Sequence, residues 1–133
     1  MSHVSELHRL LLLEADELLG ELISFRLEML GYSVSIARTL AEATLASAER
    51  FDLVLIDADI ESVDAADFVM ELRADSVSAE TPVLILSSIS DPEQIRKLHV
   101  AGANAYVVMP YDPATLEDKI EQLLAGGQTR VTV

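Results

Sequence analysis

Three acidic residues stand at the ends of apolar runs that are typical of buried strands. Asp57 closes the run DLVLID, Asp59 lies two residues further on, and Glu14 directly follows RLLLL. An unpaired buried carboxylate is costly, so such residues reach water, a partner or a metal ion. Three carboxylates in one crevice would hold a hard divalent cation or raise one another's pKa. Glu14, Asp57 and Asp59 are therefore candidate metal ligands; the alternative is that one or two only cap helices or lie in solvated loops.

A serine closes another apolar run, PVLILS, and would bring a hydroxyl to the same region. No GxSxG motif surrounds Ser87 and no histidine ends a strand, so a hydrolase nucleophile is not predicted. The motifs GxGxxG and GxxxxGKS are missing from the sequence, which removes the usual dinucleotide and Walker-type phosphate sites.

The elements that must position these side chains are five short apolar runs alternating with segments of helical periodicity. The runs LLLL, LVLI and VLIL contain no polar alternation, as expected of strands buried on both faces of a parallel sheet. In the first helical segment the apolar stripe is formed by Leu18, Leu22, Phe25 and Met29, which predicts that this side faces the sheet. We predict strands at 9–13, 33–37, 52–57, 82–87 and 105–109, and helices at 17–30, 39–49, 65–74, 92–101 and 113–125.

This alternation predicts an α/β fold with a doubly wound, five-stranded parallel sheet and helices on both faces. In such sheets ligands bind at the carboxyl ends of the strands, where the acidic residues and Ser87 would meet. The 133 residues suit one domain. We place it at residues 9–125, between an N-terminal extension (1–8) and a flexible tail (126–133).

Composition narrows the classes of partner. The net charge is −14 and lysine plus arginine number 9 against 23 acidic residues, so binding to nucleic acid is not expected. No apolar run reaches the ~18 residues of a membrane helix, and the first residues do not resemble a signal peptide. The absence of cysteine suits a reducing compartment. We expect a cytoplasmic protein that binds neither membrane nor nucleic acid.

Taken in order, these motifs resemble the receiver domain of bacterial response regulators, from about Arg9 to Ala125. The segment DLVLIDADIESVDAADF resembles the phosphoacceptor strand and its loop, TPVLILSS the fourth strand, and AGANAYVVMP the fifth strand. The resemblance implies the flavodoxin-like strand order 2-1-3-4-5. It also implies that Asp57 is the phosphoacceptor, that Ser87 contacts the phosphoryl group as a switch residue, and that Tyr106 is the signalling aromatic. Pro110 falls where the family has a cis peptide bond.

The sequence also departs from the family pattern. The acidic pair after the first strand is Glu14 and Ala15, so one Mg²⁺ ligand is missing, and Asp16 comes one position late. The lysine that would pair with the phosphoryl group is replaced by Met109, which has neither charge nor donor. Mg²⁺ is the expected cofactor, held more weakly because of Ala15, with Asp59 as a hypothetical replacement ligand.

The resemblance implies a single-domain receiver, not an enzyme, that takes a phosphoryl group from a histidine kinase or phosphotransfer protein. Its signal would pass through the surface of the fourth helix, fifth strand and fifth helix to a separate output protein, and homodimerisation stays open. One alternative is a pseudo-receiver that keeps the fold as an interaction module without being phosphorylated. A further alternative is a small aspartyl-phosphate phosphatase, suggested by the Asp-x-Asp pattern of Asp57 and Asp59.

Overall fold

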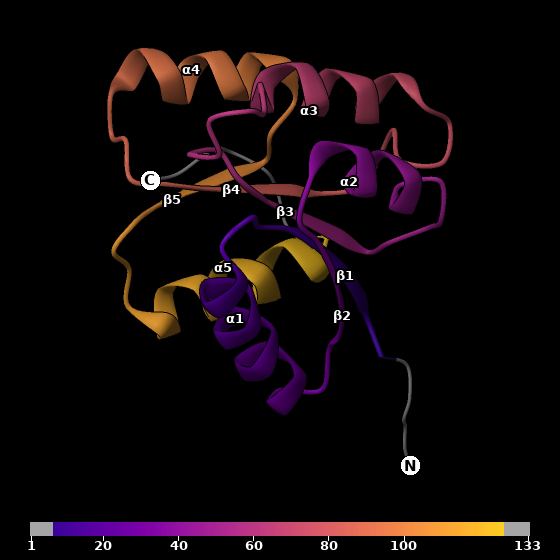
Figure 1. Ribbon diagram of the computed structural model, residues 1–133, viewed down its shortest axis with the longest axis vertical. Helices are drawn as coiled ribbons and strands as arrows, with labels where there is room; N and C mark the ends of the chain where they lie inside the picture. The colour runs from indigo at the N-terminus through magenta and orange to yellow at the C-terminus, as the bar shows by residue number, and fades with distance from the viewer. Residues whose placement is uncertain (1–6, 127–133) are drawn as a thin grey trace.

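The computed structural model describes residues 7–126, and five strands alternate with five helices along this part of the chain (Figure 1). The predictions for residues 1–6 and 127–133 lie outside the described residues. In chain order the elements are β1 (Arg9–Leu13), α1 (Glu17–Met29), β2 (Ser33–Ala37), α2 (Leu40–Ala46), β3 (Leu53–Asp57), α3 (Ala65–Ala74), β4 (Val83–Ser87), α4 (Pro92–Ala101), β5 (Ala105–Val108) and α5 (Pro113–Leu124).

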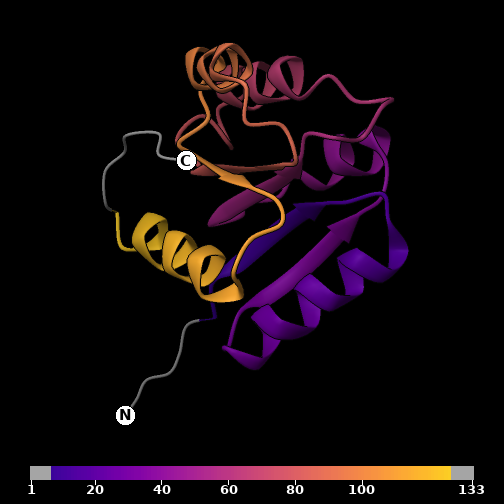
Figure 2. The same ribbon diagram turned by 90° about the vertical axis from the view of Figure 1, so that its left-hand side faces the viewer.

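The strands form one parallel sheet in the order β2-β1-β3-β4-β5, which confirms the predicted fold. Figures 1 and 2 show the sheet as the middle of three layers, with α2, α3 and α4 on one face and α1 and α5 on the other. Chain order switches direction at β1, between β2 and β3. The carboxyl ends of β1 and β3 therefore flank the crevice where a ligand is expected in such sheets.

Two hydrophobic cores lie on the two faces of the sheet because successive strand residues point to opposite sides. Leu10, Leu12, Leu53 and Leu55 pack against α1 and α5, while their alternating neighbours on β1 and β3 pack against α2, α3 and α4. This explains why the central strands read as continuous apolar runs: both of their faces are buried.

The orientation of α1 differs from the prediction. The stripe expected to face the sheet is exposed, with Leu18 at 68% and Met29 at 72% of full exposure, and Leu22 and Phe25 are exposed with them. The helix instead buries Gly20, Ile23, Ser24 and Leu27, which share its other face. A Cβ at Gly20 would lie 3.2 Å from a guanidinium nitrogen of Arg38 and 3.5 Å from Cγ of Glu14, so the helix packs directly on these side chains. Both faces of α1 carry apolar residues, so periodicity alone favoured the wrong one.

The predicted ends of the other elements differ from the structure by a few residues. The helices begin within one residue of the predicted starts, and Thr39, Asp64 and Asp91 each accept a backbone N–H of the first turn. α2 ends at Ala46, earlier than predicted, and is followed by a turn. Gly102 ends α4 with a φ of 124°, a conformation that favours glycine.

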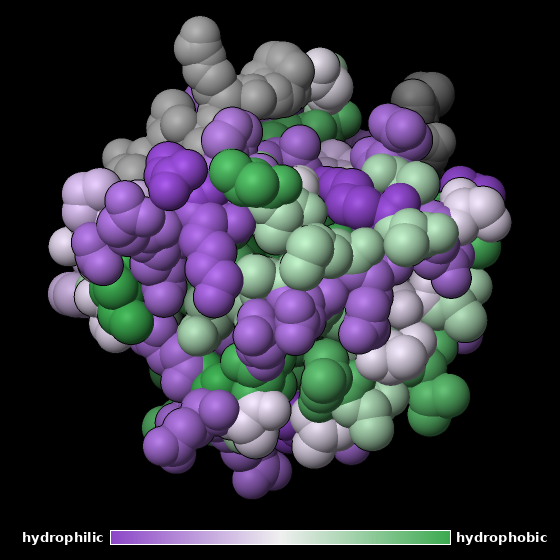
Figure 3. Space-filling view, turned by 90° about the horizontal axis from the view of Figure 1, so that it is seen from above, coloured by the Kyte–Doolittle hydropathy of each residue, from purple (hydrophilic) through white to green (hydrophobic). Residues whose placement is uncertain are grey.

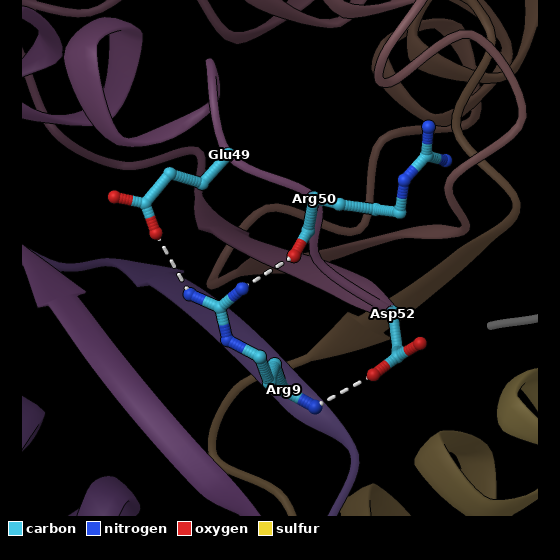
Figure 4. Close-up of polar contacts among 4 residues, drawn as sticks. All are labelled: Arg9, Glu49, Arg50 and Asp52. Atoms are coloured by element: carbon cyan, nitrogen blue, oxygen red, sulfur yellow. Dashed lines mark hydrogen bonds and ion pairs between the residues drawn. The ribbon is translucent and has the colours of Figure 1, made fainter.

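At the amino ends of the strands, on the side of the sheet opposite the crevice, Arg9 makes several contacts with the segment before β3 (Figure 4). Its backbone N–H donates to Asp52, and its guanidinium donates to Glu49 and to the carbonyl of Arg50 at 2.9 Å each. The same guanidinium lies 4.7 Å above the ring of Phe51. These contacts fasten the segment before β3 to the start of β1, and hence fix where β3 begins.

A second arginine joins α3 to the loops around β4. The guanidinium of Arg73 donates to the carbonyls of Thr81 at 2.7 Å and Gly102 at 2.8 Å, and to the side chain of Asn104 at 2.8 Å. Asn104 in turn accepts the N–H of Val83 at the start of β4. Arg73 therefore fixes α3 to the starts of β4 and β5, and its pKa is lowered by burial.

Candidate functional site

Two carboxylates meet where β1 and β3 end. The parallel pairing of these strands runs from Leu10 with Leu53 to Leu13 with Ile56, so the next pair is Glu14 with Asp57. Both belong to the strand positions that face α1 and α5, so their side chains leave the sheet on the same side. Asp57 is 7% exposed and Glu14 is 1% exposed. The fold therefore places two acidic groups side by side at the crevice, of which Asp57 has the greater access to solvent.

Glu14 is a buried acid with one unsatisfied oxygen. Its Oε2 accepts the backbone N–H of Asp16 at 3.1 Å, whereas its Oε1 is buried and has no hydrogen-bond partner among the described residues. Burial raises the pKa of Glu14 to about 8, and the neighbouring Asp57 carboxylate adds to the rise. Near neutral pH, a proton or a cation is therefore needed to stabilise this side chain.

The carboxylate of Asp59 points to the end of β4 and accepts two hydrogen bonds there. Its Oδ1 accepts the hydroxyl of Ser87 at 2.6 Å and its Oδ2 accepts the N–H of Ser88 at 2.8 Å. The backbone N–H of Asp59 meanwhile donates to Asp57 at 2.8 Å. Although burial opposes ionisation, these hydrogen bonds lower the pKa of Asp59, so the group is an anion at neutral pH.

The three predicted metal ligands are not gathered into one set. Residues 7–126 contain no group of three His, Asp or Glu side chains placed to hold a metal ion. The reason is that Glu14 and Asp57 lie together while both carboxylate oxygens of Asp59 have partners at the end of β4. Ala15 supplies no ligand, and Asp16 caps α1 by accepting the N–H of Leu19 at 2.9 Å.

Ser87 and Tyr106 are linked through a residue that the sequence did not single out. Ser87 is fully buried, and Gln94 on α4 approaches its hydroxyl at 3.5 Å and donates to the Tyr106 hydroxyl at 3.1 Å. Tyr106 in turn donates to the carbonyl of Ile89 at 2.7 Å. Tyr106 is 1% exposed, so its ring lies inside the protein beneath α4. A continuous chain of polar contacts thus runs from Asp59 to β5.

The end of β5 carries Met109 and Pro110. The N–H of Met109 donates to the carbonyl of Ser87 at 2.7 Å, and the Met109–Pro110 bond is cis, as in the family that the sequence resembles. The side chain of Met109 is partly buried and packs against the core on the α1 and α5 side. This strand end therefore brings a thioether, and no positive charge, towards the site.

Two other residues were missed by sequence reasoning. Gln94 lines a groove of about 450 Å³ between α4 and the loop after β3, together with Ala58 and Lys97. Tyr111 follows the cis proline, and its pKa is raised by burial and by the charges of Glu14 and Asp57. The place of Tyr111 directly after Pro110 was the available signal that it lies near the strand ends. Gln94 had no such signal, because its partners come from β4 and β5.

A family model for the response regulator receiver domain matches residues 10–121. The chain belongs to this family. Receiver domains are signalling modules of two-component systems, and they interact with histidine kinases and downstream effectors. No helix among residues 7–126 is long and apolar enough to cross a membrane.

Similar proteins include regulators and isolated receivers. A probable transcriptional regulator, ycf27 of Cyanidium caldarium, is 30% identical over 92% of this chain and 49% of its own length. The chain spans about half the length of the curated relatives it matches first. The chemotaxis response regulator CheY4 of Vibrio cholerae is 26% identical and superposes with a TM-score of 0.82 over 89% of this chain and 99% of its own.

A third neighbour concerns the metal. The receiver domain of the sensor histidine kinase PA1611 from Pseudomonas aeruginosa has a magnesium ion coordinated in its active-site cleft. It is 23% identical to this chain, with a TM-score of 0.81 over 90% of this chain and 99% of its own, so it supports the fold.

Proposed function

We propose that this receiver accepts a phosphoryl group on Asp57 from a phosphohistidine of a kinase or phosphotransfer protein. The observation that carries the proposal is the position of Asp57 at the carboxyl end of β3, at the switch in strand order and beside Glu14. The signal then passes through Ser87, Gln94 and Tyr106 to the surface of α4, β5 and α5. This path follows the polar contacts that join these three side chains.

The transfer makes one bond and breaks one. A carboxylate oxygen of Asp57 attacks phosphorus, an O–P bond forms, and the P–N bond of phosphohistidine breaks with its electron pair going to the imidazole nitrogen. Charge spreads over the three equatorial oxygens in the transition state. The N–H groups of Asp59 and Ser88 and the hydroxyl of Ser87 are the donors at this edge that can stabilise such an anion.

The residues of the crevice fit a divalent cation with two side-chain ligands. Glu14 and Asp57 offer the carboxylate oxygens that Mg²⁺ prefers. Oε1 of Glu14 is buried and has no hydrogen-bond partner among the described residues, so it can bind a cation or carry a proton. When bound, Mg²⁺ would neutralise charge on the transferred group. The carboxylate of Asp59 is turned to Ser87 and Ser88 and is not part of this pair.

The test is phosphorylation by acetyl phosphate at saturating Mg²⁺, followed by mass spectrometry of the intact protein and its peptides. We expect one phosphoryl group, located on Asp57. The variant Asp57→Asn should gain none, whereas Asp118→Asn, at an exposed position on α5, should be modified like the natural chain. Absence of modification on the natural chain at saturating donor and Mg²⁺ contradicts the proposal.

A pseudo-receiver is the second candidate, because specific observations favour it. Met109 brings no cation to the site, Ala15 supplies no metal ligand, and the donors at the end of β4 already bind Asp59. Such a protein would bind its partner in one state through the same surface. The phosphorylation experiment separates the two candidates, since a pseudo-receiver remains unmodified under conditions in which a competent receiver is modified.

A further inference from the structure

The two donors at the end of β4 are occupied by an anion of the protein itself. Ser87 lies next in register after Leu86, which pairs with Asp57 across the β3–β4 ladder. Its hydroxyl and the N–H of Ser88 are linked to the phosphoacceptor through Asp59, whose own N–H donates to Asp57 at 2.8 Å. Both donate to the same carboxylate, that of Asp59, at 2.6 Å and 2.8 Å. Charge-assisted hydrogen bonds of this length are among the stronger ones in proteins.

A phosphoryl group on Asp57 would need the same donors. Its oxygens would lie at the carboxyl end of β3, next to the end of β4, and Met109 offers no cation to pair with them. A carboxylate that accepts a hydroxyl and a backbone N–H satisfies these donors in the way that two phosphoryl oxygens would. Asp59 and the phosphoryl group cannot both hold them, and the two anions repel each other.

We propose that the Asp59 carboxylate is an internal competitor of the phosphoryl group: it occupies the Ser87 and Ser88 donors in the unmodified chain and must leave them before phosphorylated Asp57 is stabilised. The inference rests on the proposed phosphorylation of Asp57. It adds that Asp59, as a positioning residue, slows this phosphorylation.

The contacts beyond Ser87 show what this competition controls. The Ser87 hydroxyl, fixed by Asp59, also accepts the N–H of Ile89 at 3.1 Å, and the Ile89 carbonyl accepts the hydroxyl of Tyr106. Asp59 therefore holds Ser87, the loop after β4 and the inward Tyr106 in one arrangement without a phosphoryl group.

The experiment compares rates of phosphorylation by acetyl phosphate at saturating Mg²⁺ in Asp59→Ala, Asp59→Asn and the natural chain. Asp59→Ala frees both donors, so we expect a rate at least about tenfold higher, by the loss of one charge-assisted competitor. Asp59→Asn keeps a single acceptor oxygen and should be intermediate. The matched control is Glu61→Ala, which removes an exposed carboxylate from the same loop and should stay within about twofold of the natural chain.

A second measurement does not depend on phosphorylation. In ¹H–¹⁵N spectra the Ser88 amide should shift in Asp59→Ala, while the dispersion of the other amides shows that the variant is folded. Modification of Asp57 at equal or lower rate in Asp59→Ala, an unmoved Ser88 amide, or equal acceleration by Glu61→Ala overturns the inference and leaves the proposed function standing. Failure of the natural chain and all variants to be modified overturns the proposed function itself.

Discussion

Replacing Glu14 by glutamine tests the electrostatics of the crevice most directly. The substitution keeps the shape of the side chain and removes its ability to ionise. In the natural chain, burial raises the pKa of Glu14 from 4.5 to about 8, so the folded state holds a proton that the unfolded state has released. Proton binding by the folded state stabilises it below pH 4.5, and this stabilisation is lost as the pH rises towards 8.

The magnitude follows from the two pKa values. A rise from 4.5 to about 8 corresponds to about 5 kcal/mol between the fully protonated and fully ionised limits. We therefore compare the unfolding free energy of Glu14→Gln with that of the natural chain at each pH. As the pH rises from about 5 to about 9, this difference should increase by about 4 kcal/mol in favour of the variant. Tyr111, whose pKa is raised above 10.0 by burial and by the charges of Glu14 and Asp57, ionises above this pH range and does not contribute to the difference.

The assay is urea unfolding followed by circular dichroism in metal-free buffer at several pH values across that range. Glu17→Gln is the control, because Glu17 is exposed in the first turn of the same helix; its difference from the natural chain should stay within about 0.5 kcal/mol at every pH. A difference for Glu14→Gln that does not change with pH would refute the reasoning, since it would mean that the folded state accommodates the Glu14 charge as well as water does.

Two substitutions test other parts of the structure. Arg73→Met removes the partly buried hydrogen bonds to Thr81, Gly102 and Asn104, so the unfolding free energy should fall by about 3 kcal/mol. Arg96→Met, which breaks an exposed pair, should cost less than about 1 kcal/mol, and equal losses would contradict the assigned role of Arg73. Met109→Lys brings an ammonium group to the end of β5 and should speed phosphorylation of Asp57 by about 100-fold. An unchanged rate would show that this strand end does not face the transferred group.

Much of the fold was predictable because local patterns reflect burial. The strands β1, β3 and β4 read as continuous apolar runs, since helices cover both of their faces. Helix starts were predictable within one residue, and capping residues such as Thr39 and Asp64 act within one turn of the chain. The face of α1 was not predictable, because both of its sides carry apolar residues and the choice depends on how the whole helix packs on the sheet.

The surface illustrates the same limit. Figure 3 shows hydrophilic side chains over much of the face formed by α3 and α4, with hydrophobic ones between them. Val100 on α4 and Met70 on α3 are exposed, although their residue types would suit a core. Which apolar residues stay at the surface depends on how whole helices pack, and that packing involves residues far apart in the sequence.

By itself, the sequence determined the identity and order of the site's components: a phosphoacceptor candidate at Asp57, acidic neighbours, Ser87, and the loss of a cation at Met109. These are properties of residue type and of position within one strand. Only the tertiary structure decided which of these side chains contact one another. It pairs Glu14 with Asp57 and gives Asp59 to Ser87 and Ser88, because β1, β3 and β4 come side by side. Hydrogen bonds between strands, across tens of residues of chain, leave no mark in local sequence.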